Sequence, residues 1–500
     1  MANLYETLRA SFPKTPDAVF LTQPSGAQLT YAALDRLTAG LANRLVGAGA
    51  RPGDRIMMQV EKTPQAVALY LAAIRAGLVF IPLNMAYARD ELAYLCGDAQ
   101  PSVVVSDSQS PFAAQGFPLP SGCARFTLEA DGTGSLTEGL PLVAFTTVAA
   151  ADDDIAAILY TSGTTGKPKG AMLTHANLAS NAITLCDYWG ITGQDVLLHA
   201  LPIFHTHGLF VALNTTLISG GQMIFLPRFD TDAVFAALPR ATTMMGVPTF
   251  YTRMLDDPRL TRAACAHMRL FVSGSAPLLA ETFARFHDRS GHTILERYGM
   301  TETNMIASNP LAGERRAGTV GHPLPGVSVR ITDDRGQTRP AGEPGGIEVK
   351  GPNVFKGYWQ NPEKTRAEFR ADGYFITGDV GRVDKEGYLS IVGRSKDLII
   401  TGGFNVYPKE VEDVINAMDG VAESAVIGLP HHDFGEGVVA VVIPEGPPLS
   451  AEKIIARCRD HLAAFKSPKA VIFLDALPRN AMGKVEKAKL RVTYEAHFSR

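Results

Sequence analysis

Hydrophobic positions in the first third of the chain follow two alternating spacings. From Leu29 to Gly49, apolar residues recur three and four positions apart, which predicts a helix that ends at glycine. Short apolar or β-branched runs at 55–59, 79–83 and 103–106 predict strands between helices. Because helices alternate with strands in this way, the sequence predicts an α/β region with mostly parallel strands.

The pattern changes between Gly318 and Gly393. Gly, Pro and Asp punctuate short apolar runs there, which predicts a small β-rich, barrel-like part. Helix and strand patterns then return, with Pro408 at the start of one predicted helix and Ser450 as the cap of another. The predicted organisation is a large N-terminal domain, 1–393, with its β-rich part at 318–393, and a small α+β domain, 398–500, joined by 394–397.

Composition narrows the class of protein. Of the 500 residues, 46% are hydrophobic and 19% are charged, as in globular rather than disordered chains. The net charge of −3 gives no reason to expect nucleic acid or an anionic membrane as a partner. The chain starts without a basic segment followed by an apolar one, and polar or helix-breaking residues interrupt its most apolar run, 66–83. We therefore expect a cytoplasmic protein without a membrane span.

The segment Tyr160–Gly170, with the sequence YTSGTTGKPKG, has the composition of a phosphate-binding loop after a strand. Its glycines let the backbone bend around an anion, which the hydroxyl and lysine side chains can contact. It differs from the P-loop of nucleotide triphosphatases because Pro168 follows the lysine and disfavours a helix there. The alternative is a flexible surface turn. The candidate phosphate contacts are Thr161, Ser162, Gly163, Thr164, Thr165, Gly166 and Lys167.

This segment resembles the signature of the adenylate-forming superfamily, which includes acyl-CoA synthetases, luciferases and the adenylation domains of peptide synthetases. Further blocks that resemble those of the family occur in the same order, so the resemblance covers nearly the whole chain. It implies a ligase that uses ATP to form an acyl adenylate and pyrophosphate, and then transfers the acyl group to coenzyme A with release of AMP. The blocks are Phe204–Gly208, Ser273–Pro277, Tyr298–Glu302, Tyr374–Asp379, Gly393–Asp397, Gly402–Asn405 and Asn480–Lys484.

The resemblance also implies roles for residues around the nucleotide. Thr301 and Glu302 would lie at the α-phosphate, with Glu302 as a ligand of Mg²⁺, a hard cation that prefers oxygen. Tyr298 would stack on the adenine, Asp379 would accept hydrogen bonds from the ribose hydroxyls, and Arg394 would be a second ribose contact. For Glu302 and Asp379 the alternative is a residue in or after a turn without a role at the nucleotide, and for Arg394 it is a surface arginine at a domain edge. The segment expected along the base is Ser275, Ala276 and Pro277.

Lys484 matches the catalytic lysine of the family, which bridges the acyl carboxylate and the α-phosphate. Acetylation would remove its charge, so a lysine acetyltransferase is an expected partner. The family rotates its small domain between the two half-reactions, and Lys396 aligns with the pivot. After the rotation, Gly402 and Gly403 would face the channel for the pantetheine of coenzyme A. His205 resembles the residue at the inner end of that channel, although a structural histidine is an equal alternative.

Arg297 indicates which kind of acid the enzyme would activate. A buried arginine in an acyl pocket needs a partner, and a second carboxylate on the substrate matches the guanidinium. The run RYGMTETNM, together with the HTHG of residues 205–208, looks most like malonyl-CoA synthetases. Thr206 and Met305 would then bound the space at C2 of the acid, which predicts malonate as the preferred substrate and methylmalonate as a weaker one. The alternative is that Arg297 pairs with a protein carboxylate.

Other activities share the first half-reaction. The chain resembles enzymes that could adenylate another small carboxylate or load a separate carrier protein, but it contains no carrier-domain attachment site for phosphopantetheine. A luciferase-like monooxygenase would consume the adenylate by oxidation. A degenerate synthetase that only binds ligands is disfavoured because Glu302, Asp379 and Lys484 are all present.

Overall fold

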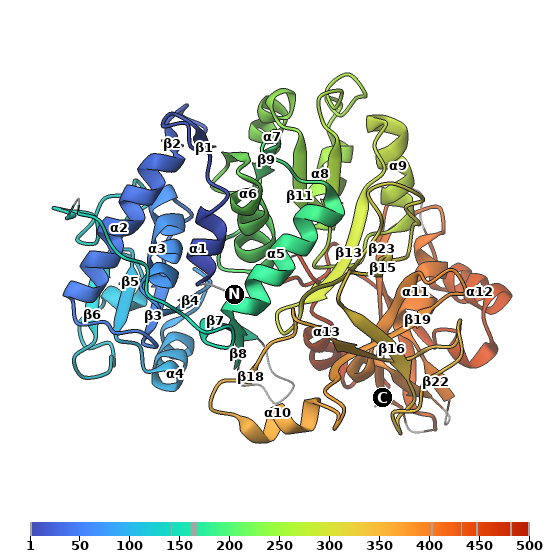
Figure 1. The fold of residues 1–500 in the computed structure, drawn as a ribbon. Coiled ribbons are helices and arrows are strands. Elements are labelled where there is room, and N and C mark those ends of the chain that lie inside the picture. The colour runs from blue at the N-terminus through green and yellow to red at the C-terminus, as the bar shows by residue number, and fades with distance from the viewer. Residues whose placement is uncertain are drawn as a thin grey trace.

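The computed structural model of the protein describes residues 3–141, 143–161, 168–401, 404–431, 433–446, 449–480 and 483–498, and these residues form four β-sheets with surrounding helices (Figure 1). One sheet has seven strands in the order β18-β8-β7-β4-β3-β5-β6, and its central strands are parallel. Its strands are β3 (Arg55–Gln59), β4 (Val79–Pro82), β5 (Val103–Ser106), β6 (Ala124–Thr127), β7 (Ile155–Thr161), β8 (Lys169–Thr174) and β18 (Gly357–Tyr358).

A second sheet has nine strands in the order β15-β14-β13-β12-β11-β9-β10-β1-β2. Its middle is parallel, so the carboxyl ends of neighbouring strands lie at one edge, where ligands of open α/β sheets bind. Its strands are β1 (Val19–Thr22), β2 (Gln28–Thr30), β9 (Val196–His199), β10 (Gln222–Phe225), β11 (Thr243–Gly246), β12 (Leu270–Ser273), β13 (Leu295–Met300), β14 (Asn304–Ser308) and β15 (His322–Pro323).

Helices from both halves of the N-terminal region pack together and share one large core with the two sheets. Helix α1 contacts α3, α5 and α6, and α2 contacts α3. A π-helix (η2, His207–Leu213) leads into α6. The helices of this region are α1 (Leu4–Arg9), α2 (Tyr31–Gly47), α3 (Pro64–Arg75), α4 (Arg89–Ala99), α5 (His175–Trp189), α6 (Asn214–Ser219), α7 (Thr231–Ala237), α8 (Pro248–Asp256) and α9 (Ala280–Ser290).

The β-rich part forms an antiparallel sheet in the order β16-β17-β19-β20, and α10 (Pro362–Glu368) lies between two of its strands in sequence. The C-terminal part has its own sheet and two further hydrophobic clusters, and α11 contacts β20. Their elements are β16 (Ser328–Thr332), β17 (Gly345–Lys350), β19 (Phe375–Val383), β20 (Leu389–Arg394), β21 (Ile399–Thr401), β22 (Phe404–Val406), α11 (Pro408–Asn416), β23 (Val421–His431), β24 (Gly435–Pro444), α12 (Ala451–His461), β25 (Ala470–Phe473) and α13 (Lys487–Tyr494).

The mixed α/β fold with a large sheet-containing N-terminal part and a smaller C-terminal part confirms the predicted fold class. The predicted cap is present, because Ser450 accepts a hydrogen bond from the Lys453 N–H at the start of α12. The helix expected from Leu29 begins at Tyr31, since Gln28–Thr30 pairs with β1 as strand β2. The domain limits at 393 and 398 stay a prediction.

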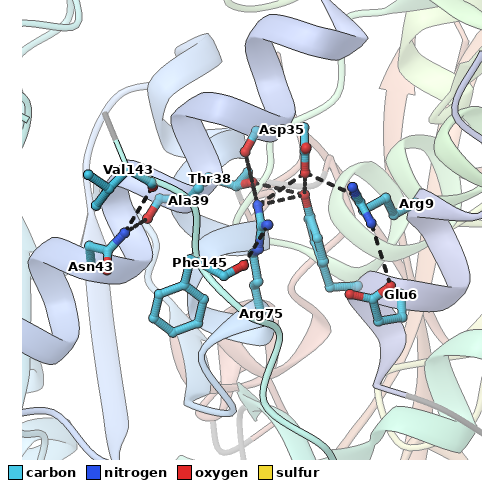
Figure 2. Close-up of polar contacts among 10 residues, drawn as sticks. Glu6, Arg9, Asp35, Thr38, Ala39, Asn43, Arg75, Val143 and Phe145 are labelled. Atoms are coloured by element: carbon cyan, nitrogen blue, oxygen red, sulfur yellow. Dashed lines mark hydrogen bonds and ion pairs between the residues drawn. The ribbon is translucent and has the colours of Figure 1, made fainter. Parts of the chain in front are cut away.

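A buried arginine joins three helices of the N-terminal core. Arg75, at the end of α3, donates to the Tyr5 hydroxyl of α1, to the Asp35 carboxylate of α2 and to the Phe145 carbonyl (Figure 2). The Arg75 side chain is 7% exposed, whereas that of Asp35 is 30% exposed. Figure 2 shows Arg9 contacting the same carboxylate, and this second contact is exposed. This network fixes the helix packing and the segment after residue 143.

Removing the Arg75 charge should destabilise the N-terminal core. We expect Arg75→Met to lower the free energy of unfolding by about 3 kcal/mol, because Tyr5 and Asp35 lose a buried partner. Urea unfolding followed by tryptophan fluorescence measures this change. Arg9→Met is the control, since its ion pair with Asp35 is partly exposed and contributes less than about 1 kcal/mol. Equal effects of the two substitutions would contradict the assignment.

Candidate active site

The predicted phosphate loop lies between the antiparallel strands β7 and β8. Thr161 at the end of β7 pairs with Lys169 at the start of β8, so the two described ends of the predicted loop are adjacent. The Lys169 ammonium lies 5.3 Å from the ring centre of Tyr358, and burial lowers its pKa. Most of the predicted phosphate contacts lie outside the described residues. They are Ser162, Gly163, Thr164, Thr165, Gly166 and Lys167.

Helix α4 anchors both ends of this loop. The Tyr160 hydroxyl donates to Asp98 Oδ2 at 2.5 Å, and the Tyr94 hydroxyl donates to the Pro168 carbonyl at 3.2 Å. The Trp359 indole also donates to the Asp98 carbonyl. Sequence reasoning missed these anchors, because Tyr94 and Asp98 lie in an amphipathic helix about 65 residues upstream and belong to no recognisable motif.

Glu302 lies beside Thr161, at the end of β7. Its Oε1 accepts a hydrogen bond from the Thr161 hydroxyl at 3.4 Å, and the Tyr358 hydroxyl is 3.1 Å from the same oxygen. Burial raises the pKa of the Glu302 carboxyl. Thr301 precedes it in the turn between β13 and β14, and is partly buried. The structure therefore brings the predicted α-phosphate block to the predicted phosphate loop.

A single buried carboxylate next to a phosphate loop fits one ligand position of Mg²⁺. The described residues contain no group of three or more His, Cys, Asp or Glu side chains that would hold a metal by themselves. Mg²⁺ keeps several waters and takes substrate phosphates as ligands, so one protein carboxylate suffices at such a site. Glu302 therefore fits the cation that would accompany ATP.

The residues predicted at the ribose form one cluster. Asp379 on β19 accepts from the Tyr298 hydroxyl at 2.5 Å and from Arg394 Nε at 3.0 Å. Asp379 and Arg394 are cross-strand partners in the sheet of β19 and β20. Burial and the adjacent Asp379 carboxylate raise the pKa of Tyr298. A carboxylate can accept about four hydrogen bonds, so Asp379 keeps acceptor capacity for a diol.

Lys484 lies at the same cluster, although it is about ninety residues away in sequence from the end of β20. Burial and, to a smaller extent, the nearby Arg394 guanidinium lower the pKa of the Lys484 ammonium to about 8, whereas Asp379 opposes the shift. The preceding Gly483 packs on α8, since a Cβ added to it would lie 3.1 Å from Thr249 Oγ1. The C-terminal part thus places the lysine within electrostatic range of Arg394 and Asp379.

Arg297 on β13 is 3% exposed, and its guanidinium has unused donors. Among the described residues, no partner accepts from Nε or Nη2. Burial lowers the Arg297 pKa to about 9, and the nearby Tyr251 opposes the shift. The guanidinium lies against Gly274, where an added Cβ would be 2.4 Å from Cζ. Buried polar groups usually have hydrogen-bond partners, so the two unpartnered nitrogens of this buried guanidinium need an explanation.

Two residues at the start of η2 also have a buried polar atom without a hydrogen-bond partner among the described residues. Thr206 Oγ1 and His207 Nε2 are buried and have no hydrogen-bond partner among the described residues. Burial, reinforced by the Arg297 charge, lowers the pKa of both His205 and His207, that of His205 to about 4. Both imidazoles are therefore neutral at pH 7. The Ser275 hydroxyl is 3.2 Å from His207 Nδ1, which ties the segment after β12 to this group.

Met305 on β14 and the segment after β12 complete the surroundings. Met305 is buried, and Asn181 on α5 holds its backbone by accepting from its N–H and donating to its carbonyl. The adjacent Gly299 leaves room for this residue, because a Cβ there would lie 2.6 Å from Met305 Cε. Ser275 has a φ of +73°, a conformation that non-glycine residues rarely adopt outside functional sites. Ala276 is partly buried and Pro277 is exposed.

The predicted hinge lies between two ion pairs. Lys396 is exposed in a short 3-10 helix (η4, Ser395–Asp397). Before it, Arg394 pairs with Asp379; after it, Asp397 pairs with Arg491 of α13 at 2.6 Å. The predicted coenzyme A contacts Gly402 and Gly403, between β21 and β22, lie outside the described residues.

Comparison with known proteins identifies the family of the chain. A family model of AMP-binding enzymes matches residues 8–359, and a model of the AMP-binding enzyme C-terminal domain matches residues 410–484. A feruloyl-CoA synthase of Amycolatopsis sp is 38% identical over 477 residues, which cover 93% of this chain and 94% of that protein. A malonate–CoA ligase of Arabidopsis thaliana is 37% identical over 486 residues, which cover 90% of this chain and 79% of that protein.

Solved structures of other proteins are also similar to this chain. The ATP-bound structure of MatB from Rhodopseudomonas palustris is 54% identical, covers 100% of both chains and has a TM-score of 0.96. The apo structure of the same protein has a TM-score of 0.86. The chain thus has the closer overall shape to the ATP-bound form. Across the described residues, none of the helices has both the length and the apolar character needed to cross a membrane.

Proposed function

Because the chain belongs to the AMP-binding enzyme family and is an acyl-CoA ligase that works through an acyl adenylate, we propose that malonate is the acid it activates, with methylmalonate a weaker substrate. The observation that carries this proposal is the buried Arg297 guanidinium with unpartnered Nε and Nη2 among the described residues. The notion that Arg297 pairs with a protein carboxylate has no support in the described part of the chain, where the arginine makes no ion pair.

The proposed pocket suits a three-carbon diacid. One carboxylate would bind Arg297, and the other would face the α-phosphate near Lys484 and Thr301. Thr206 and Met305, both buried, would bound the space at C2, so that hydrogen fits there better than methyl. A monocarboxylic acid would leave the buried guanidinium without an anion, which is costly in a low-dielectric site.

In the proposed adenylation, one oxygen of the acid attacks the α-phosphorus of ATP, and pyrophosphate leaves with the electron pair of the broken P–O bond. Lys484 would approach the incoming carboxylate and an α-phosphate oxygen, and reduce the repulsion between the two anions. Mg²⁺ bound at Glu302 would neutralise phosphate charge. Asp379 and Arg394 would hold the ribose so that the α-phosphorus stays in line.

In the proposed second step, the thiol of coenzyme A attacks the acyl carbon and AMP leaves. Gly402, Gly403 and the neutral His205 are the proposed contacts of the pantetheine arm. The small domain would first rotate about residues 394–397, which removes Lys484 from the phosphate. Acetylation of Lys484 by a lysine acetyltransferase would remove its charge and is proposed to stop adenylation.

Restricting the proposed pivot should separate the two half-reactions. We expect Lys396→Pro to slow thioester formation by at least about tenfold and adenylation by less than about threefold, because proline fixes φ at a residue that must turn. Pyrophosphate exchange measures adenylation, and the release of AMP from supplied acyl adenylate measures the second step. Lys396→Ala, which keeps a free φ, is the control. A wild-type rate of thioester formation in the proline variant would place the hinge elsewhere.

The acid is tested by a screen of pyrophosphate release with acetate, propionate, malonate, methylmalonate, benzoate, octanoate and ferulate. Ferulate is included because a relative at 38% identity is a feruloyl-CoA synthase. Malonate should give the highest kcat/KM, and thioester formation should require coenzyme A. If a monocarboxylic acid is turned over faster, the malonate proposal fails. If free coenzyme A accepts no acyl group, the enzyme loads a carrier protein instead.

A further inference from the structure

A further buried cation, Lys62, lies between the carboxyl ends of strands from two different sheets. Lys62 follows β3 of the seven-stranded sheet, while its partners follow or end β9 and β10 of the nine-stranded sheet. Its Nζ is 2.8 Å from His199 Nδ1, 2.9 Å from the His199 carbonyl and 2.6 Å from the Leu226 carbonyl. The ring centre of Phe225 is 4.4 Å away. The proposed adenylation step gives this group no role.

The hydrogen bonds determine where the protons lie. His199 Nε2 is 2.9 Å from the Gly208 carbonyl, which accepts only, so Nε2 must carry a proton. If His199 is neutral, Nδ1 is an acceptor and Lys62 must donate to it and to both carbonyls, which uses all three protons of an ammonium group. If the proton instead moves to the imidazole, the pair still holds one positive charge. Burial lowers the pKa of both groups, yet each form that satisfies all four contacts is singly charged.

This charge holds the loop that carries the acid-binding residues. His199 ends β9, and its hydrogen bond to the Gly208 carbonyl closes the segment that contains Thr206 and His207. The closure is tight, since a Cβ added to Gly208 would lie 2.0 Å from the Pro202 carbonyl oxygen.

We propose that Lys62 and His199 are positioning residues for the acid: the ammonium sets the His199 tautomer, and His199 in turn fixes the Gly208 turn so that Thr206 and His207 face the substrate. This inference rests on the proposed function, because it assigns these two residues to the acyl pocket. Lys62 and His199 do not touch the substrate. They act through one hydrogen bond to the loop.

The two ring nitrogens of His199 can be tested separately. His199→Gln keeps a donor near the Nε2 position for the Gly208 carbonyl, whereas His199→Asn keeps an acceptor near Nδ1 for Lys62 and loses that donor. We expect His199→Asn and Lys62→Met to raise KM for the acid at least about tenfold, with KM for ATP changed less than about twofold, and His199→Gln to stay within about threefold of wild type in both. The double variant Lys62→Met/His199→Asn should be no worse than either single variant.

Arg75→Met is the matched control, because it also removes a buried cation but serves only helix packing. It should lower the free energy of unfolding, but it should not change KM for the acid more than KM for ATP. The measurements use the acid that the wild-type enzyme turns over fastest, so failure of the malonate proposal does not affect this test. If Lys62→Met does not fold, the comparison of His199→Asn with His199→Gln alone decides whether the inference holds. Equal changes in KM for acid and ATP, or a His199→Asn variant with wild-type KM, would overturn the inference.

Discussion

Replacing Lys484 with alanine should slow adenylation by about 10²–10⁴-fold and leave thioester formation from supplied acyl adenylate near the wild-type rate. The lysine lies at the cluster of Asp379 and Arg394, and its pKa responds to both of these charges. A compact cation there can reduce the repulsion between an incoming carboxylate and the α-phosphate. In the proposed second half-reaction the small domain would have rotated away from this position, so that step should not need the lysine.

The pH dependence of adenylation gives an independent readout of the same role. Because the Lys484 pKa is lowered to about 8, the ammonium is the main form below pH 8 and is lost as the pH rises. The kcat/KM for adenylation, which reports the free enzyme, should therefore fall above about pH 8. Lys484→Arg, which remains charged, should have lower activity but no such alkaline fall.

The control for Lys484 is Lys489→Ala. Lys489 is exposed on α13 and pairs with Glu486, so its loss should leave both half-reactions unchanged. Pyrophosphate exchange measures the first step, and thioester formation from supplied acyl adenylate measures the second. Equal losses in both steps for Lys484→Ala would show that the lysine supports folding or domain docking rather than adenylation.

Sequence patterns located the nucleotide half of the site because its residues belong to contiguous blocks. Thr161, Glu302, Asp379 and Arg394 were each predicted from a short motif, and the structure brings them together through β7, β13, β19 and β20. The α/β fold was equally accessible, since helical and strand spacings differ clearly in the sequence. The roles of these residues stay predictions until they are measured.

Long-range side-chain contacts were beyond the reach of the sequence. Lys62 bonds with His199 over 137 positions and Tyr160 with Asp98 over 62, and neither pair has a characteristic spacing. Lys62 contacts backbone carbonyls and a ring nitrogen, and Tyr160 contacts a carboxylate. Many side chains with a hydrogen-bond donor could contact such groups. For Lys62 and His199, the packing of the two sheets determines which strand ends meet. The contact of Arg297 with Gly274 likewise depends on β12 and β13 being neighbours.

The largest change in specificity should come from Arg297→Met. Methionine keeps much of the side-chain volume against Gly274 but removes the charge that the proposed distal carboxylate binds. We expect kcat/KM for malonate to fall roughly 30- to 4,000-fold, which corresponds to a loss of about 2–5 kcal/mol of transition-state stabilisation. For propionate, which lacks the second carboxylate, the change should be less than about threefold, because the wild-type arginine has no anion to bind.

Steady-state pyrophosphate release with both acids, at fixed saturating ATP, measures the two effects. Arg315→Met is the matched control: it is a partly buried arginine that donates to the Pro310 and Leu311 carbonyls, and its loss should affect both acids equally. Arg297→Lys should recover only part of the malonate activity, because an ammonium cannot form the two parallel hydrogen bonds of a guanidinium. A parallel loss with malonate and propionate in Arg297→Met would show that the arginine supports the fold of β13, and the enzyme would then be a ligase for a different acid.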